Sequence, residues 1–230
     1  MTIKSNVAIL LFAQTAKVES DIKFFATNRK KNLNLWNILN YRILKEIKKT
    51  KLDFFVFNEN NQVGETFGER ITAATQQVFD NGFEKVIVIG NDCLDLDAKK
   101  ILNASQILLQ NTTVLGPDNN GGTYLMGVSK SNFDSNAFDA ISWQSKLVLK
   151  ELQVLFKDRN LIGLEVLNDF NSSNFFKFNF KRIGFSNLLK HLLQICIFEL
   201  NFIFNFQKGS FFIYFNSILF NKGSPESVVI

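Results

Sequence analysis

Short apolar runs alternate with longer amphipathic stretches from residue 7 to residue 167. Apolar runs bounded by turn residues are typical of strands buried on both faces of a sheet, and we expect strands at 7–13, 54–57, 85–90, 112–115, 124–128 and 161–167. Apolar residues three and four positions apart predict helices at 35–49, 67–79, 97–109 and 143–156, with a short helix within the loop 132–142. This alternation predicts an α/β fold with a mainly parallel sheet.

The character of the sequence changes at Phe175, after which about half of the chain's 26 Phe residues follow. Residues 192–206 are nearly all apolar but contain four polar residues, and they lack the roughly 20 uninterrupted apolar residues that a membrane-spanning helix needs. We expect one domain at residues 1–174 and an apolar extension at 175–230, packed on that domain or on a second copy in a homodimer. The alternative is contact of this extension with a partner or a membrane surface.

Composition narrows the class of protein. Apolar residues make up 46% of the 230-residue chain and charged residues 20%, which favours a packed core over disorder. The net charge of +5 is spread along the chain without a basic face interleaved with exposed aromatic residues, so we expect no nucleic-acid partner. Cys93 and Cys196 have no disulfide or metal-ligand spacing and suit a reducing compartment, and we interpret residues 7–13 as a strand rather than an export signal. We therefore expect a cytoplasmic protein.

Catalysis by a histidine has no support in this sequence. The single histidine, His191, lies in an apolar helical pattern and is more typical of a structural residue than of a general base. Without a second histidine, Ser–His and Cys–His mechanisms are not expected.

The residues that follow the apolar runs are the candidates for binding a metal ion or a ligand. Asp92 comes just after the run 86–89, and ligands of open α/β sheets bind beyond the carboxyl ends of the strands. A carboxylate at that position can hold a metal ion or a polar substrate. The alternative is a turn residue that accepts hydrogen bonds from backbone amides. Gly121 and Gly122 allow close approach of the backbone to a ligand, or form an ordinary tight turn.

Five motifs occur in a fixed order along the chain. They are Phe12-Ala13, the segments 62–70 (QVGETFGER), 90–96 (GNDCLDL) and 115–127 (LGPDNNGGTYLMG), and Trp143 with residues 167–169. In this order they resemble an uncharacterised bacterial family of GT-A-type, glycosyltransferase-like proteins. That family is related to the molybdenum-cofactor guanylyltransferase and phospholactate guanylyltransferase families. Each motif alone is weak, whereas their order and spacing together are fairly specific.

The resemblance implies a three-layer, Rossmann-like nucleotide-diphospho-sugar transferase fold that binds a nucleotide or a nucleotide-sugar and an acceptor. By position, Asp92 matches the family aspartate of the nucleotide and metal site, where Mg²⁺ or Mn²⁺ would neutralise a diphosphate. Asp118 or Asn120 would frame the acceptor as the catalytic residues. The residues expected to contact the nucleotide are Phe12, Ala13, Lys17, Arg70, Asn91, Gly121 and Gly122.

Two residues beside these motifs have alternatives that the sequence leaves open. Arg70 either reaches a phosphate or forms an exposed ion pair with Glu69 or Glu65. Asp95 is expected to cap the helix that begins near Asp97 rather than to take part in catalysis.

The sequence departs from the family pattern at several positions. Asn120 replaces the Asp before Gly-Gly, Leu94 replaces a Pro, and Asn171 replaces the second Asp of an Asp-x-Asp pair. Residues 14–20 replace a loop that contains Pro, Gly and Lys-Thr-Arg, so the usual cradle for phosphates is absent. Two hypotheses follow: a metal-dependent glycosyltransferase or nucleotidyltransferase, and a degenerate, non-catalytic binding or scaffold protein on the same fold that uses its Phe-rich extension.

Overall fold

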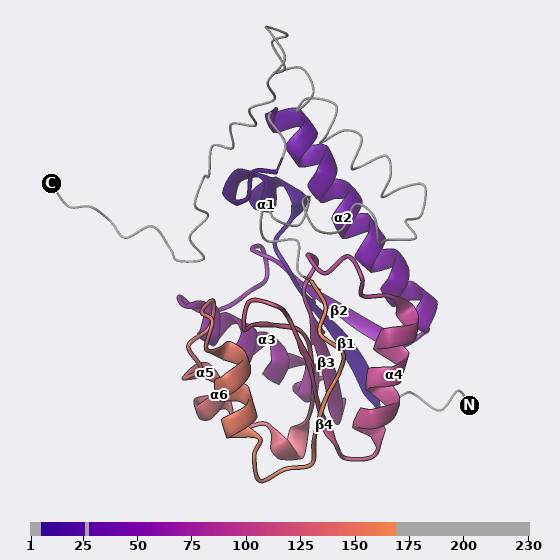
Figure 1. Cartoon of the computed structure of the whole chain (residues 1–230), viewed down its shortest axis with the longest axis vertical. Helices are drawn as coiled ribbons and strands as arrows, with labels where there is room; N and C mark the ends of the chain where they lie inside the picture. The colour runs from indigo at the N-terminus through magenta and orange to yellow at the C-terminus, as the bar shows by residue number, and fades with distance from the viewer. Residues whose placement is uncertain (1–5, 26–27, 169–230) are drawn as a thin grey trace, which may run out of the picture. The chain divides into compact units, whose positions relative to one another are not determined.

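The computed structural model describes residues 6–25 and 28–168 (Figure 1). Within these residues a six-stranded sheet has the strand order β2-β1-β3-β5-β4-β6. The strands are β1 (Val7–Phe12), β2 (Asp53–Phe57), β3 (Lys85–Ile89), β4 (Thr113–Pro117), β5 (Thr123–Ser129) and β6 (Leu161–Gly163). The helices are α1 (Ala16–Ile22), α2 (Arg29–Thr50), α3 (Phe67–Asp80), α4 (Ala98–Leu109), α5 (Ser135–Asp139) and α6 (Val148–Leu155), with a 3₁₀ turn at Lys130–Asn132. The predicted α/β fold is confirmed.

Both faces of the sheet are covered, which explains the unbroken apolar runs of the strands. Along β1, Ala8, Leu10 and Phe12 enter one core, and the alternate residues of the strand enter the other. Helices α3, α5 and α6 contribute to the first core, whereas α4 and the last turns of α2 contribute to the second. Figure 1 shows α3, α5 and α6 on one side of the sheet and α4 on the other. These are the three layers that the motifs implied.

One strand runs against the others. β1 pairs in parallel with β2 and β3, and β4 pairs in parallel with β6, whereas β5 is antiparallel to both β3 and β4. The register places Ile89 opposite Leu125 and Pro117 opposite Thr123. The start of β5 therefore lies at the same edge of the sheet as the carboxyl ends of β3 and β4.

Several predicted boundaries differ from the structure. Helix α2 begins at Arg29 rather than near Leu35, and residues 16–22 form α1 where the sequence indicated only a loop. The predicted helix at 143–156 is limited to α6, because Trp143 Nε1 donates to the Phe138 carbonyl and holds the preceding segment as a turn. The predicted strand 161–167 is β6 followed by an isolated bridge between Asp118 and Leu167.

The chain divides into two compact units. One comprises residues 1–15 and 39–170, and the other residues 16–38 and 171–230. The expected boundary at residue 174, the Phe-rich extension, His191 and Cys196 all lie outside the described residues. None of the described helices combines the length and apolar character needed to cross a bilayer.

A buried asparagine organises the described part of the second unit. Asn32 is fully buried, and its Nδ2 donates to the carbonyl oxygens of Ser20 and Lys23 at 2.8 and 2.9 Å. Its Oδ1 accepts from the Phe25 amide at 2.9 Å, and Trp36 Nε1 also donates to Lys23 at 3.2 Å. The weak apolar pattern of α1 is thus compensated by hydrogen bonds, which periodicity does not reveal.

Removal of the Phe138 ring tests the core beneath α3. Phe138 is fully buried, with its ring centroid 5.1 Å from that of Phe133 and 5.0 Å from that of Trp143. We expect F138A to lower the free energy of unfolding by about 3–5 kcal/mol, because it removes apolar contacts and leaves a cavity. The exposed Val154 gives the control, V154A, with an expected change within about 0.5 kcal/mol. Urea unfolding measures the change in each variant. A small change in F138A, similar to that in V154A, would contradict the assignment of Phe138 to the core.

Candidate functional site

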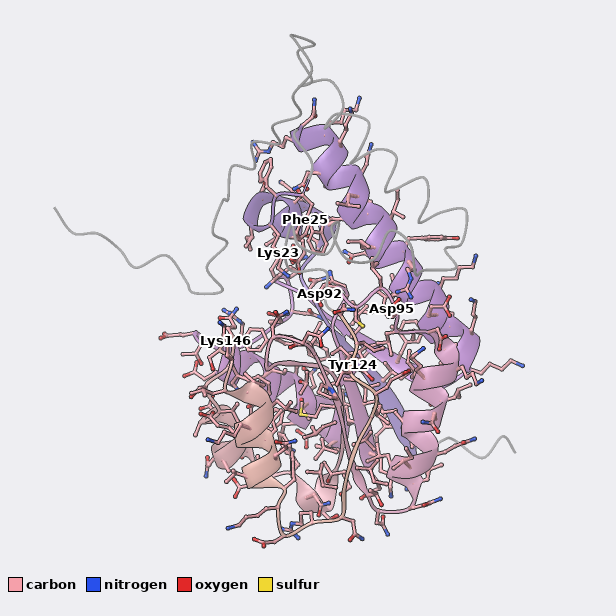
Figure 2. All side chains as sticks on the ribbon, viewed as in Figure 1. Lys23, Phe25, Asp92, Asp95, Tyr124 and Lys146 are labelled. Carbon is pink, nitrogen blue, oxygen red and sulfur yellow. The ribbon has the colours of Figure 1, made fainter. Side chains whose placement is uncertain are left out.

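The candidate site lies at the carboxyl ends of β1, β3 and β4. From β1 the chain passes to β2 on one side and then returns to β3 on the other side, so the crevice between β1 and β3 is a topological switch point. The segments that reach this edge of the sheet are 13–15, 58–66, 90–97 and 118–122. Figure 2 shows Asp92 and Asp95 at this edge. These segments include most of the residues singled out from the sequence.

Hydrogen bonds from α2 tie the end of β3 to the end of β1. Asn91 is buried, and its Nδ2 donates to Asn40 Oδ1 at 2.7 Å. Asn40 Nδ2 in turn donates to the backbone carbonyl of Gln14 at 3.4 Å. The side-chain amide of Asn91 is therefore engaged in this link, and its contact with a nucleotide stays a prediction.

Arg42 holds the loop that carries Asp92. Its two terminal nitrogens donate to the carbonyl oxygens of Cys93 and Leu96 at 3.2 and 2.9 Å. Glu46, one turn further along α2, accepts from the Ala98 amide at 3.1 Å. Burial lowers the pKa of Arg42, while the Glu46 carboxylate and other nearby acidic groups oppose that shift. Because guanidinium groups stay protonated in proteins, Arg42 remains a charged donor to this loop.

The prediction that Asp95 caps the following helix is wrong. The N-cap of α4 is Asp97, whose Oδ1 accepts from the Lys100 amide at 2.9 Å. Helix α4 begins at Ala98, so a residue two positions before the cap is not placed to bind the first free amides. Asp95 is instead half-buried, and burial raises its pKa although Lys100 and Arg42 act in the opposite direction.

Asp92 is half-buried at the mouth of β3. A methyl group on Gly90 would lie 3.2 Å from Asp92 Oδ1, so the carboxylate folds back over the end of the strand. Across residues 6–25 and 28–168, no group of three or more His, Cys, Asp or Glu side chains could hold a metal ion. A single carboxylate still suits Mg²⁺, which keeps several waters and binds through one or two carboxylates together with substrate phosphates. The residues present therefore fit a metal that arrives with a phosphate ligand.

The Asp118 carboxylate shapes the Gly-Gly turn. Asp118 is only 5% exposed, and its Oδ1 accepts from the Asn120 amide at 2.6 Å and the Gly122 amide at 2.8 Å. A methyl group on Gly122 would lie 2.5 Å from Asp118 Oδ2. Gly121 has φ +85°, and a methyl group there would lie 2.3 Å from the Lys146 carbonyl. Close packing thus explains why both positions are glycine, and their contact with a ligand stays a prediction.

Asp92 and Asp118 follow two strands that are not neighbours. β5 separates β3 from β4, so the ends of these two strands lie about 10 Å apart. Asn120 is exposed at the turn beside Asp118. The turn is thus a separate part of the site from the metal position predicted at Asp92.

Phe12 and Ala13 have structural partners. Phe12 is 9% exposed and its ring packs edge-to-face on Phe67, with centroids 5.4 Å apart, so the contact of Phe12 with a nucleotide stays a prediction. The Ala13 amide donates to the Phe57 carbonyl at 3.1 Å.

Arg70 binds the loop that precedes its own helix. Its Nη1 donates to the Glu65 carbonyl at 3.1 Å, while its buried Nε has no partner among the described residues. Glu69 accepts from the amides of Glu65 and Thr66 and forms a capping box with Thr66. The Thr-x-x-Glu pattern of that capping box was readable from the sequence. The reach of Arg70 to a phosphate stays a prediction.

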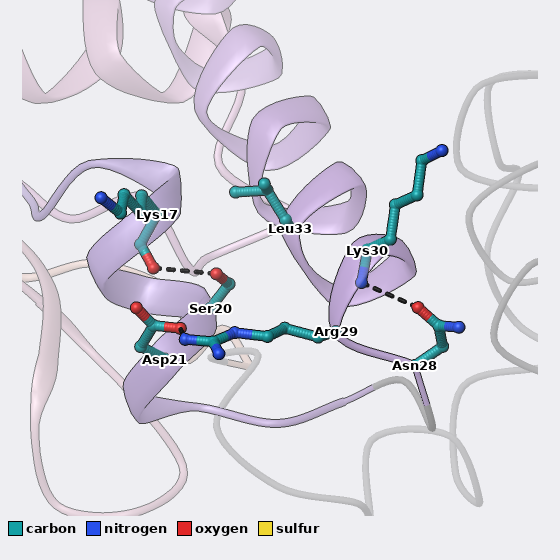
Figure 3. Close-up of a pocket in the computed structure, with 7 residues that line it drawn as sticks. All are labelled: Lys17, Ser20, Asp21, Asn28, Arg29, Lys30 and Leu33. Atoms are coloured by element: carbon teal, nitrogen blue, oxygen red, sulfur yellow. Dashed lines mark hydrogen bonds and ion pairs between the residues drawn. The ribbon is translucent and has the colours of Figure 1, made fainter.

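Lys17 belongs to the second unit. It lines a cavity of about 560 Å³ together with Ser20, Asp21, Asn28, Arg29, Lys30 and Leu33 (Figure 3). Arg29 forms an ion pair with Asp21 at 2.7 Å, and Lys17 itself is exposed. The cavity therefore has a basic lining that one internal ion pair partly neutralises.

Sequence reasoning missed Glu59. Its carboxylate accepts from the amide of Thr15 at 2.8 Å and from the hydroxyl of the same residue. The two residues are 44 positions apart, and no periodicity or motif links them. Only the polar, loop-like character of residues 58–64 pointed to this segment.

Alanine substitution at two glycines with positive φ, Gly82 and Gly121, separates backbone strain from steric clash. A Cβ added to Gly82, at φ +90°, would lie in open space, whereas a Cβ on Gly121, at φ +85°, meets the Lys146 backbone. We expect G82A to cost about 1–2 kcal/mol of unfolding free energy from the left-handed conformation alone. G121A should cost a further 1–3 kcal/mol or so, because the segment around Lys146 must shift. Equal costs in chemical denaturation would show that the turn does not pack on Lys146.

Removal of the Arg42 donors tests the support of the Asp92 loop. We expect R42M to lower the free energy of unfolding by about 1–3 kcal/mol, because the carbonyl oxygens of Cys93 and Leu96 lose the hydrogen bonds from the guanidinium group. Lys45, exposed on the same helix, provides the matched control K45M. Amide hydrogen exchange should quicken at residues 91–98 in R42M and stay unchanged in K45M. Unchanged exchange in both variants would refute the support by Arg42.

Comparisons with known proteins bear on the family resemblance and on the fold. The model of the bacterial family described as "Uncharacterized protein conserved in bacteria (DUF2064)" matches residues 45–145. No match was found among curated proteins.

Among solved structures, a candidate nucleotide-diphospho-sugar transferase from Desulfovibrio desulfuricans G20 is 20% identical, and the match covers 84% of this chain and 97% of that one with a TM-score of 0.68. Molybdopterin-guanine dinucleotide biosynthesis protein A from Archaeoglobus fulgidus is 13% identical, with 83% and 98% covered and a TM-score of 0.34. The resemblance to an uncharacterised bacterial family is thus confirmed over residues 45–145, and the fold is that of a nucleotide-diphospho-sugar transferase.

Proposed function

We propose that this protein is a transferase that binds a nucleotide or a nucleotide-sugar at the carboxyl ends of β1, β3 and β4. It would transfer either the sugar or the nucleotidyl group, with Mg²⁺ or Mn²⁺ held by Asp92. The observation that supports this most is the placement of Asp92 at the topological switch point, in a loop that Arg42 fixes from behind. The transferase-like fold shared with the Desulfovibrio protein supports it further.

In this proposal the chain's own residues position charge. Asp92 would hold the cation, and a bound Mg²⁺ or Mn²⁺ would stabilise negative charge on the leaving diphosphate. Asp118 keeps the Gly121-Gly122 turn in one shape through two amide hydrogen bonds. This turn leaves Asn120 exposed, and in this proposal its amide would orient an acceptor hydroxyl. Asp118 and Asn120 are the catalytic residues in this proposal. The protein is further proposed to be cytoplasmic and to form a homodimer.

A second candidate function is a degenerate binding or scaffold protein that holds a nucleotide without turnover. Two observations favour it. Asn120 stands where the family has an acidic residue, and among the described residues Asp92 belongs to no three-ligand metal cluster. Incubation of the protein and Mn²⁺ with nucleotide-sugars, or with nucleoside triphosphates and sugar phosphates, followed by chromatographic detection of released nucleotide or pyrophosphate, separates the two functions. Release above the level of the D92N variant supports a transferase, whereas binding without release supports the binding protein.

Thermal unfolding with nucleotides tests the proposed binding. A nucleotide present at a hundred times its dissociation constant adds about 2.7 kcal/mol, which raises the melting temperature of a chain of this size by roughly 5–10 °C. We expect such a shift with at least one nucleoside diphosphate or nucleotide-sugar, and we expect Mn²⁺ to enlarge it. D92N should abolish the contribution of Mn²⁺, and D158N, at an exposed site, should retain it. The absence of any shift at millimolar ligand would count against both candidate functions.

A further inference from the structure

The segment just beyond β1 binds an acidic side chain of the same protein, that of Glu59. Thr15 lies just beyond β1, on the β1 side of the switch point. Its amide donates to one carboxylate oxygen of Glu59 at 2.8 Å, and its hydroxyl donates to the other oxygen. A carboxylate bound by an amide and a hydroxyl uses the same donors that a phosphate group would use.

Glu59 is presented by a hydrogen-bonded turn that follows β2. The Asn58 amide donates to Asn61 Oδ1 at 2.7 Å, and Asn58 Oδ1 accepts from the Asn60 amide at 3.0 Å. Asn61 Nδ2 donates to the Val56 carbonyl at 3.0 Å, which fastens the turn to the strand. Side-chain bonds of this kind give a short loop a defined shape. These hydrogen bonds shape the turn so that the Glu59 carboxylate reaches Thr15.

The Glu59 side chain carries a negative charge at neutral pH. Partial burial acts to raise its pKa, but the hydrogen bonds from the Thr15 hydroxyl and amide outweigh that effect, and the pKa lies below its ordinary value. The contact lies at the exposed rim of the site, where solvent and a ligand both have access. It is thus reversible, since an exposed hydrogen bond to a charged group contributes only modestly.

We propose that Glu59 is a built-in competitor for the anionic group of the ligand. Its carboxylate occupies the Thr15 donors in the ligand-free protein, and a diphosphate displaces it on binding. The inference rests on the proposed function, because it concerns the anion subsite of the same nucleotide site. Through this one acidic residue the chain weakens its own affinity for phosphates.

Inorganic pyrophosphate in the presence of Mg²⁺ is the probe that tests this competition. Isothermal titration calorimetry compares the wild-type protein with E59Q, which removes the charge, and E59A, which removes the whole contact. E65Q is the matched control, because Glu65 is an exposed carboxylate in the same loop and its side chain does not bind Thr15. Equal urea midpoints for all four proteins establish that each variant is folded.

We expect E59Q and E59A to bind pyrophosphate about tenfold more tightly than wild type, because one unit charge close to the polyanion is gone. E65Q should stay within about twofold of wild type, because a more distant exposed charge is screened. Equal affinity in wild type and both Glu59 variants, an equal gain in E65Q, or no binding to any of the four proteins would overturn the inference.

The outcomes also separate this inference from the proposed function. Nucleotide stabilisation of the wild-type protein without an effect of Glu59 on pyrophosphate binding would leave the transferase proposal standing and reject the competitor. Tighter pyrophosphate binding by E59Q, with no nucleotide stabilising any variant, would reject the transferase proposal and keep the competitor.

Discussion

The geometry of the candidate site depends on hydrogen bonds that reach the end of β3 from α2. A loop after a strand has free carbonyl groups, and partners outside the loop decide where its side chains lie. Here the Arg42 guanidinium binds two of these carbonyls, and Asn40 binds the side chain of Asn91. Since Asp92 lies between these attachment points, its position is set by a helix distant in sequence.

The two halves of the site are built by different means. The β3 side is held from outside by side chains of α2, whereas the Gly-Gly turn after β4 is held from inside by its own Asp118. β5 lies between these two parts and leaves them about two strand spacings apart. A ligand that touches both parts must therefore be extended, as a nucleotide-sugar with its diphosphate in the middle is. This separation agrees better with the proposed substrate class than with a compact ligand.

Much of the fold was predictable because apolar runs and helical spacing are local properties of the sequence. The strand ending before Asp92 and the helix after Gly64 were correctly placed, since each combines a clear period with turn residues. Helix α1 was missed because its stability comes from the buried amide of Asn32 rather than from an apolar face. Asp95 and Asp97 both precede the start of α4 and both are favoured N-cap residues. The sequence alone does not show which of them caps the helix, and the structure shows that it is Asp97. Glu59 was missed because its partner is brought close only by the parallel pairing of β1 with β2.

The turns at the two ends of the sheet differ in how closely they are packed. At one end the turns are crowded: Gly121 lies against the Lys146 backbone and Gly122 against the Asp118 carboxylate. At the other end Gly82, in the turn between α3 and β3, has nothing within 4 Å of the place where a side chain would begin. That end offers evolutionary latitude, because insertions there meet open solvent and leave the chemistry untouched. Divergence among distant relatives should accordingly gather in the turn that enters β3, while the opposite rim keeps its shape.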